Sequence, residues 1–122
     1  MTRIPPPPVP AGLRKALQDY PEVIQIIQDD LNDCVNEMVG RPTSPPPFEQ
    51  AVWALEGRLG DLMQKADREA EAAEARSDAM AMARASTRAF VIGCTRSDAP
   101  WYGDHSEHSL WNYFQVHKEA FE

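Results

Sequence analysis

The sequence predicts an all-α protein: an antiparallel helical hairpin or bundle built on one long central helix, with a short N-terminal helix and an aromatic C-terminal helix. Residues 48–91 contain no proline, the residue that most strongly breaks helices. Apolar residues recur at steps of three and four over two long segments, as expected for one face of a helix. The loop between those segments, residues 41–45, is short, which is typical of antiparallel neighbouring helices.

The long helix is expected to span residues 47–92. Its first half carries an apolar seam with heptad spacing, formed by Phe48, Val52, Leu55, Leu59, Leu62 and Ala66. The seam weakens over residues 67–78, but alanine, glutamate and arginine there are strong helix formers, so we expect the helix to continue. Ser77 and Asp78 offer an alternative, since they could cap a second helix. Gly93 is the expected stop, because glycine accepts the left-handed conformation that follows a helix.

The distal half of this helix needs a cover, because at about 1.5 Å per residue the helix is too long for one compact domain of this size. The residues expected to pack there are Met80, Ala83, Arg84, Thr87, Arg88, Phe90 and Val91. A C-terminal helix over residues 105–121, with the spacing of a capping box at Asp104–Glu107, is the best internal candidate to cover it. Its stripe includes Leu110, Trp111 and Phe114. The other candidates are a second copy of the chain and another protein, and we expect a homodimer.

The remaining segments complete a single helical domain over residues 1–122. Residues 1–10 form a proline-rich extended arm, which either binds an aromatic groove of a partner or lies across the protein's own helices. Residues 11–20 form a short helix, and residues 21–39 form a second helix that begins at a proline and ends before a glycine. Its expected seam is Ile24, Ile27, Leu31, Cys34 and Met38, with Val23, Val35 and Trp53 broadening the contact to the long helix.

The helix over residues 21–39 is acidic and contains no lysine or arginine. Its acidic residues are Glu22, Asp29, Asp30, Asp33 and Glu37. Asp29, Asp33 and Glu37 share one face at i, i+4 spacing, where like charges repel by a few tenths of a kcal/mol per pair. One interpretation is a surface for a basic partner protein, in the extreme a mimic of nucleic-acid phosphates. The alternative is a solvated face, partly neutralised by cations of the neighbouring helix.

Composition excludes several classes of function. The net charge of −7 argues against direct nucleic-acid binding, which needs cations to replace counterions. The two cysteines, Cys34 and Cys94, are expected to be buried free thiols, because a disulfide would need favourable geometry and an oxidising compartment. No apolar run reaches the length of a membrane span, and the N-terminus lacks the apolar core of a signal peptide. We therefore expect a cytoplasmic protein that binds neither membranes nor nucleic acid directly.

Catalytic and metal-binding signatures are weak. His105 and His108 are three apart and could share a metal, but a structural zinc site usually draws four ligands from two clusters. Asp30, Asp33 and Glu56 lie on paired helices, an arrangement similar to that of the all-α nucleotide pyrophosphohydrolases, which hold magnesium through carboxylates. The paired Glu-x-x-Glu and Glu-x-x-Asp signatures of that family are absent. We expect neither a metal nor a cofactor.

The function expected from these observations is non-enzymatic: binding to another protein, as a small acidic inhibitor or adaptor whose acidic helix engages a basic surface of a nucleic-acid-handling partner. In type, the chain is similar to the compact acidic helical inhibitors of phages and mobile elements, including anti-CRISPR proteins, although no family motif supports this. Two alternatives are a magnesium-dependent nucleotide pyrophosphohydrolase and a structural assembly protein that uses the long helix as a strut.

Overall fold

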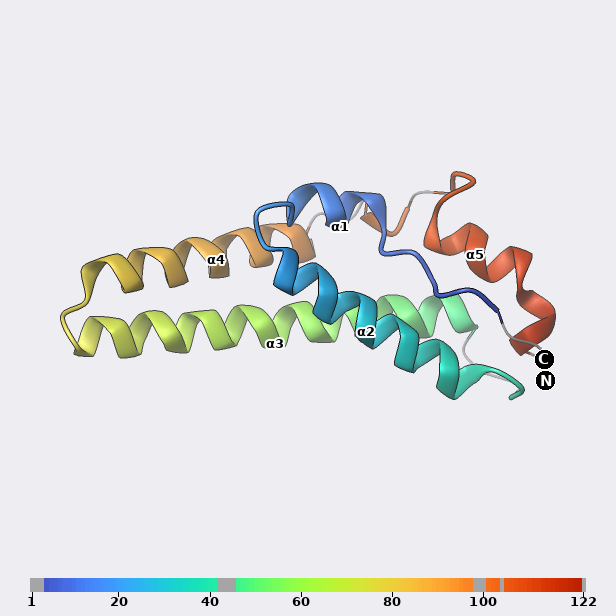
Figure 1. Ribbon diagram of the computed structural model, residues 1–122, viewed down its shortest axis with the longest axis horizontal. Helices are drawn as coiled ribbons and strands as arrows, with labels where there is room; N and C mark the ends of the chain where they lie inside the picture. The colour runs from blue at the N-terminus through green and yellow to red at the C-terminus, as the bar shows by residue number, and fades with distance from the viewer. Residues whose placement is uncertain (1–3, 42–45, 98–100, 104, 122) are drawn as a thin grey trace. The chain divides into compact units, whose positions relative to one another are not determined.

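The computed structural model describes residues 4–41, 46–97, 101–103 and 105–121, and their regular structure is entirely helical (Figure 1). In chain order the elements are α1 (Ala11–Ala16), α2 (Pro21–Met38), α3 (Pro47–Ala75), α4 (Ala79–Ser97), α5 (Leu110–Val116) and the 3-10 helix η2 (Lys118–Phe121). The all-α class is therefore confirmed. The chain divides into two compact units, Met1–Leu55 with Ala99–Glu122 and Glu56–Asp98, and α3 contributes to both. The single-domain organisation stays a prediction.

The first unit has its core between α2 and the beginning of α3. The buried face of α2 consists of Val23, Ile27, Leu31, Val35 and Met38. Ile24 and Cys34, expected in the seam, are only half-buried, so the buried stripe is turned slightly from the predicted one. On α3, Val52 and Leu55 are buried as predicted, and the two helices pack together as the expected pair. Trp53 is 58% exposed, so the prediction that it broadens this contact is wrong.

The N-terminal arm lies across the protein's own helices. The Tyr113 hydroxyl of α5 donates a hydrogen bond of 2.6 Å to the Pro5 carbonyl, and the Gln28 amide of α2 donates one of 2.7 Å to the Pro7 carbonyl. Pro7 and Val9 are buried. Because a proline-rich segment has few backbone donors, its carbonyls are the groups that side chains can hold. Of the two interpretations of the arm, the one observed is therefore that it lies across the protein's own helices.

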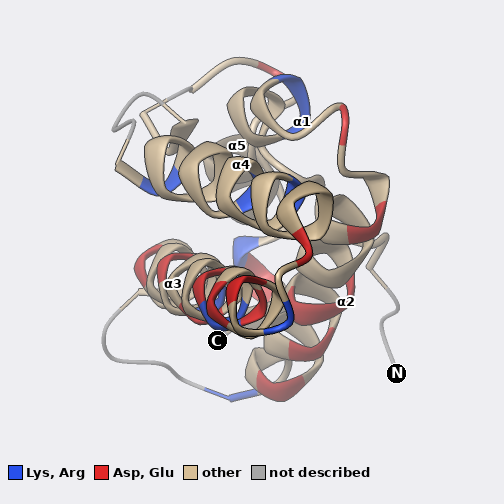
Figure 2. Ribbon diagram, turned by 90° about the vertical axis from the view of Figure 1, so that its left-hand side faces the viewer, with Lys and Arg blue, Asp and Glu red and all other residues tan. Residues whose placement is uncertain are grey.

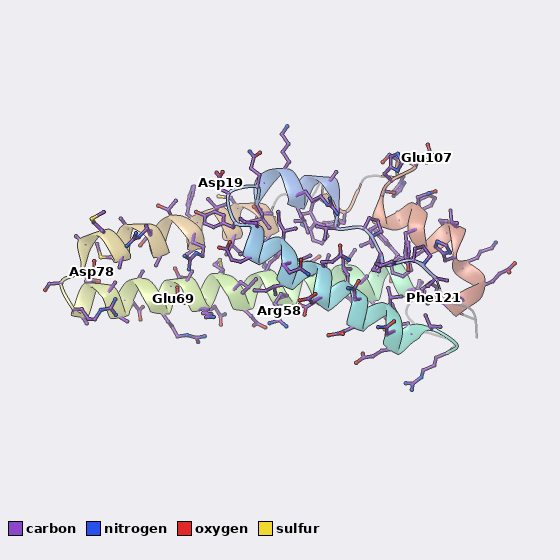
Figure 3. The ribbon with its side chains drawn as sticks, viewed as in Figure 1. Asp19, Arg58, Glu69, Asp78, Glu107 and Phe121 are labelled. Atoms are coloured by element: carbon purple, nitrogen blue, oxygen red, sulfur yellow. The ribbon has the colours of Figure 1, made fainter. Side chains whose placement is uncertain are left out.

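The long helix ends at Ala75, and the prediction that it continues to residue 92 is wrong. Ser77 adopts a left-handed conformation, with φ of 58°. The Asp78 amide donates to the Ala73 carbonyl and the Ser77 amide to the Glu74 carbonyl, each at 2.9 Å, which is the Schellman pattern of a helix end. Asp78 also begins α4, because its carboxylate accepts a 3.1 Å hydrogen bond from the Ala81 amide. Figure 3 shows Asp78 at this turn.

Helix α4 folds back antiparallel along the distal part of α3 (Figure 1). Arg88 and Glu69 form an ion pair of 3.0 Å, and the Arg96 Nε donates to the Glu56 carbonyl at 2.8 Å. Helix α4 therefore supplies a cover within the chain, which removes the original reason to expect a dimer. Gly93 is not a stop, because α4 continues to Ser97. A Cβ at Gly93 would lie 2.9 Å from the Met63 Sδ, so glycine permits a close approach of the two helices.

The C-terminal helix is shorter than predicted. Instead of beginning at residue 105, α5 begins at Leu110, and the Ser109 hydroxyl caps it by accepting a 3.0 Å hydrogen bond from the Asn112 amide. The same hydroxyl donates to the Ser106 carbonyl, which fixes the turn before the helix. Asp104, the first residue of the expected capping box, lies outside the described residues. After Val116 the chain tightens into η2, whose Ala120 carbonyl accepts from the Gly40 amide at 2.8 Å.

Candidate partner-binding surfaces

The acidic residues predicted to bind a partner lie on α2, and most of them are exposed. Glu22, Asp29, Asp33 and Glu37 are exposed, whereas Asp30 is half-buried. Figure 2 shows these acidic residues along α2. The opposite face of α2 is fixed in the core of the first unit, so the acidic face is presented by a well-anchored helix.

Two observations describe the electrostatics of this surface. The Gln25 side-chain amide donates a 2.9 Å hydrogen bond to the Asp29 carboxylate, one turn along the helix, which restricts that carboxylate. Burial, and then the negative charges of Glu37 and Asp30, raise the pKa of the Cys34 thiol. The thiol is therefore kept in its neutral form beside a row of carboxylates.

The residues predicted to pack on the distal helix lie mostly on the outside of α4. Ala83, Arg84 and Thr87 are exposed, Met80 and Phe90 are 73% and 72% exposed, and Val91 and Arg88 are half-buried. The face of α4 that is buried in the second unit consists instead of Ala85, Ala89, Ile92 and Thr95. The predicted internal packing register of α4 is therefore wrong.

The aromatic C-terminal residues are buried in the first unit. Leu110 and Phe114 are buried, and Trp111 is half-buried with its ring stacked on that of His105 at 4.4 Å. Phe121 contacts Phe114 at a ring separation of 5.2 Å. Met80 and Phe90 remain exposed, so the prediction that this stripe covers them is wrong.

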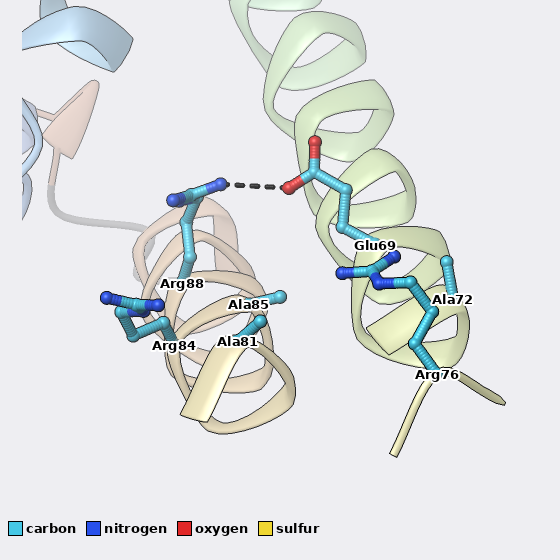
Figure 4. A pocket seen from close by; sticks show the side chains of 7 residues that line it. All are labelled: Glu69, Ala72, Arg76, Ala81, Arg84, Ala85 and Arg88. Carbon is cyan, nitrogen blue, oxygen red and sulfur yellow. Dashed lines mark hydrogen bonds and ion pairs between the residues drawn. The ribbon is translucent and has the colours of Figure 1, made fainter. Parts of the chain in front are cut away.

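A group of residues that sequence reasoning did not assemble lies between the distal ends of α3 and α4. Glu69 comes from α3, Arg76 from the turn that directly follows it, and Arg84 and Arg88 from α4 (Figure 4). These side chains are brought together by the turn at Ser77, so only the expectation of a second helix there could have found them.

Within the described ranges, no three His, Cys, Asp or Glu side chains are grouped so that they could hold a metal ion. Both cysteines are free, as predicted, but Cys34 is only half-buried and Cys94 is exposed, so the prediction that both are buried is wrong. None of the described helices is both long and apolar enough to cross a membrane. Comparisons with protein-family models, curated proteins and solved structures found no match to this chain.

Proposed function

We propose that this chain is a non-enzymatic protein-binding protein, a small acidic inhibitor or adaptor whose α2 face engages a basic surface of a nucleic-acid-handling partner. In its most specific form, the proposal is that the chain is an anti-defence protein of a phage or mobile element, such as an anti-CRISPR protein. The observation that carries it is the exposed row of Asp29, Asp33 and Glu37 on a helix that contains no cation. Two free thiols are consistent with a cytoplasmic location.

The spacing of the acidic row supports a protein partner with matching cations. Carboxylates four residues apart lie about 6 Å apart along a helix axis. Their mutual repulsion costs a few tenths of a kcal/mol per pair in the free protein. A basic surface that neutralises the row would relieve this repulsion, and charge complementarity of this kind raises the association rate and selects the partner.

Charge reversal of the row tests the proposal. The variant Asp29→Lys, Asp33→Lys, Glu37→Lys retains three like charges at the same spacing, so we expect its helicity to be unchanged. The matched control reverses Glu49, Glu107 and Glu119, which are exposed and lie outside both α2 and the distal part of α3, and it changes the net charge by the same amount.

Each protein is used as bait in a lysate of the source cells, and the retained proteins are quantified. We expect a basic nucleic-acid-binding protein that wild type and control retain, that heparin elutes, and that the α2 reversal loses. Retention of the same proteins by the α2 reversal would reject this surface.

We also propose that the exposed face of α4 joins two copies of the chain. Met80, Ala83, Thr87, Phe90 and Cys94 follow steps of three and four, the spacing of a helix–helix seam. A groove of 500 Å³ lies beside this seam, with Met63, Phe90 and Cys94 among its lining residues. Arginines occur on α4 and exposed acids on the distal part of α3, so an antiparallel second copy offers complementary charges.

The mass of the protein in solution, from light scattering after size exclusion, tests this assembly. We expect twice 13.7 kDa for the wild type and 13.7 kDa for Phe90→Glu. Val116→Glu is the control, because Val116 is also exposed but belongs to α5. A monomeric wild type, or a Phe90→Glu variant that remains dimeric, would reject the α4 interface.

A further inference from the structure

The distal ends of α3 and α4 enclose a positively charged hollow that the proposed function does not use. Its volume is 320 Å³, and its lining residues are Glu69, Ala72, Arg76, Ala81, Arg84, Ala85 and Arg88. Figure 4 shows Arg76 on the α3 side and Arg84 and Arg88 on the α4 side. The alanine side chains are too small to fill this space, and the arginines supply hydrogen-bond donors around it.

One arginine of the hollow is fixed by an ion pair. The Arg88 Nη1 lies 3.0 Å from the Glu69 Oε2, as the dashed line in Figure 4 marks. The Nε of the same side chain is buried and has no hydrogen-bond partner among the described residues. Because this buried N–H has no partner, the donors of Arg88 are not all satisfied by the described part of the protein itself.

The charge of the hollow is unusual in this acidic chain. Three guanidinium groups and one carboxylate leave a charge of two positive units among its lining residues. Asp78, at the N-terminus of α4, does not line the hollow, and its carboxylate accepts a hydrogen bond from the Ala81 amide. Residues 79–97 contain no aspartate or glutamate.

We propose that this hollow binds a phosphate group, either as the free anion or as a phosphate ester. A phosphate monoester carries about −1.5 to −2 charges at pH 7, which matches the charge of the lining. The planar guanidinium presents several N–H donors in a fork that fits phosphate oxygens. The volume is at the lower end of the range of small-molecule sites, about 300–1,000 Å³, and suits a compact anion.

The test is a titration of the full-length protein with sodium phosphate at pH 7 and constant ionic strength, followed by the amide chemical shifts of Ala72, Ala81 and Ala85. We expect saturable shifts with a Kd of about 1 mM or tighter. The variant Arg76→Gln, Arg84→Gln should bind at least about tenfold more weakly, because it loses charge-assisted hydrogen bonds. Arg76 and Arg84 both line the hollow.

Two further variants separate the hollow from general charge effects. Arg68→Gln removes an exposed α3 arginine that does not line the hollow, and it should bind phosphate like the wild type. Ala81→Leu keeps all three arginines but fills the space, and it should abolish binding.

Equal weakening in Arg68→Gln, shifts produced equally by chloride, or no saturable shift would each overturn the proposal. A parallel titration with AMP identifies the source of the phosphate, because tighter binding than inorganic phosphate indicates an ester and equal or weaker binding indicates the free anion.

Discussion

Replacement of Ser77 by glycine tests the turn that divides the predicted long helix. The φ of Ser77 is 58°, and the left-handed conformation costs a residue with a side chain about 1–2 kcal/mol. Glycine avoids this cost but loses more backbone entropy on folding, by about 0.5–1 kcal/mol. Ser77→Gly should therefore stabilise the protein by about 0.5–1 kcal/mol, which raises the Tm of a chain of this size by roughly 2–5 °C.

The assay is thermal unfolding followed by far-UV circular dichroism, with Ser86→Gly as the control. Ser86 is exposed and helical in α4, so the same chemical change there should lower stability by about 0.5 kcal/mol, because glycine is the poorer helix former. Opposite signs at the two serines are the signature of a left-handed Ser77. If both variants lower the Tm, then Ser77 is helical and the continuous helix over residues 47–92 is correct after all.

Four further predictions follow from the same contacts. Asp78→Ala removes the cap of α4 and should destabilise the protein by about 1 kcal/mol in chemical denaturation, whereas no change would show that the cap is dispensable. In the monomeric Phe90→Glu variant, Ellman's reagent at pH 8 should modify exposed Cys94 faster than Cys34, whose pKa is raised by burial and by neighbouring acids, and Cys94→Ser in the same background should remove the fast phase. Burial raises the pKa of Tyr113 to about 12, so the unfolded chain ionises first and stability should fall between about pH 10 and 12; Tyr113→Phe should reduce that slope. Hydrogen exchange should be slower at the buried amides of α2 than at those around Ala85 in α4, because leucine and isoleucine bury more apolar surface than alanine; equal rates would contradict this ranking.

Most of the helices could be predicted from the sequence because their signals are local. Pro21 begins α2 and Gly40, with φ of 78°, follows its end, as the positions of proline and glycine indicated. The end of α3 lacked such a signal. Its left-handed position is occupied by serine instead of glycine, and the surrounding alanines and glutamates favour a helix, so propensity alone predicted continuity.

The packing face of α4 could not be predicted from residue size. Two of its large apolar residues, Met80 and Phe90, follow a seam spacing and were therefore assigned to the packing face, but they are exposed, whereas Ile92 is buried. The buried register contains Ala85 and Ala89, which lie against a part of α3 whose buried residues, Ala66 and Ala73, are also small. Alanine is common on both faces of a helix, so its periodicity does not reveal which face is buried.

The acidic face could be predicted from the sequence, whereas the arginine hollow could not. The acidic residues belong to one helix, so their spacing alone places them on a common face. The hollow combines Arg76, just after the end of α3, with Arg84 and Arg88 of α4, and its existence depends on the turn at Ser77. The wrong prediction of one continuous helix over residues 47–92 therefore also prevented the prediction of this hollow.

Small side chains between α3 and α4 have two consequences that oppose each other. Alanines bury little apolar surface, so the distal hairpin gains less stability from its core than α2 gains from its leucines and isoleucines. The same alanines, at positions 72, 81 and 85, leave the 320 Å³ space around which the arginines gather. A leucine in that space would add apolar burial but displace any anion. Weak packing at the distal end is thus the physical condition for a binding site there, as expected where function and stability compete for the same residues.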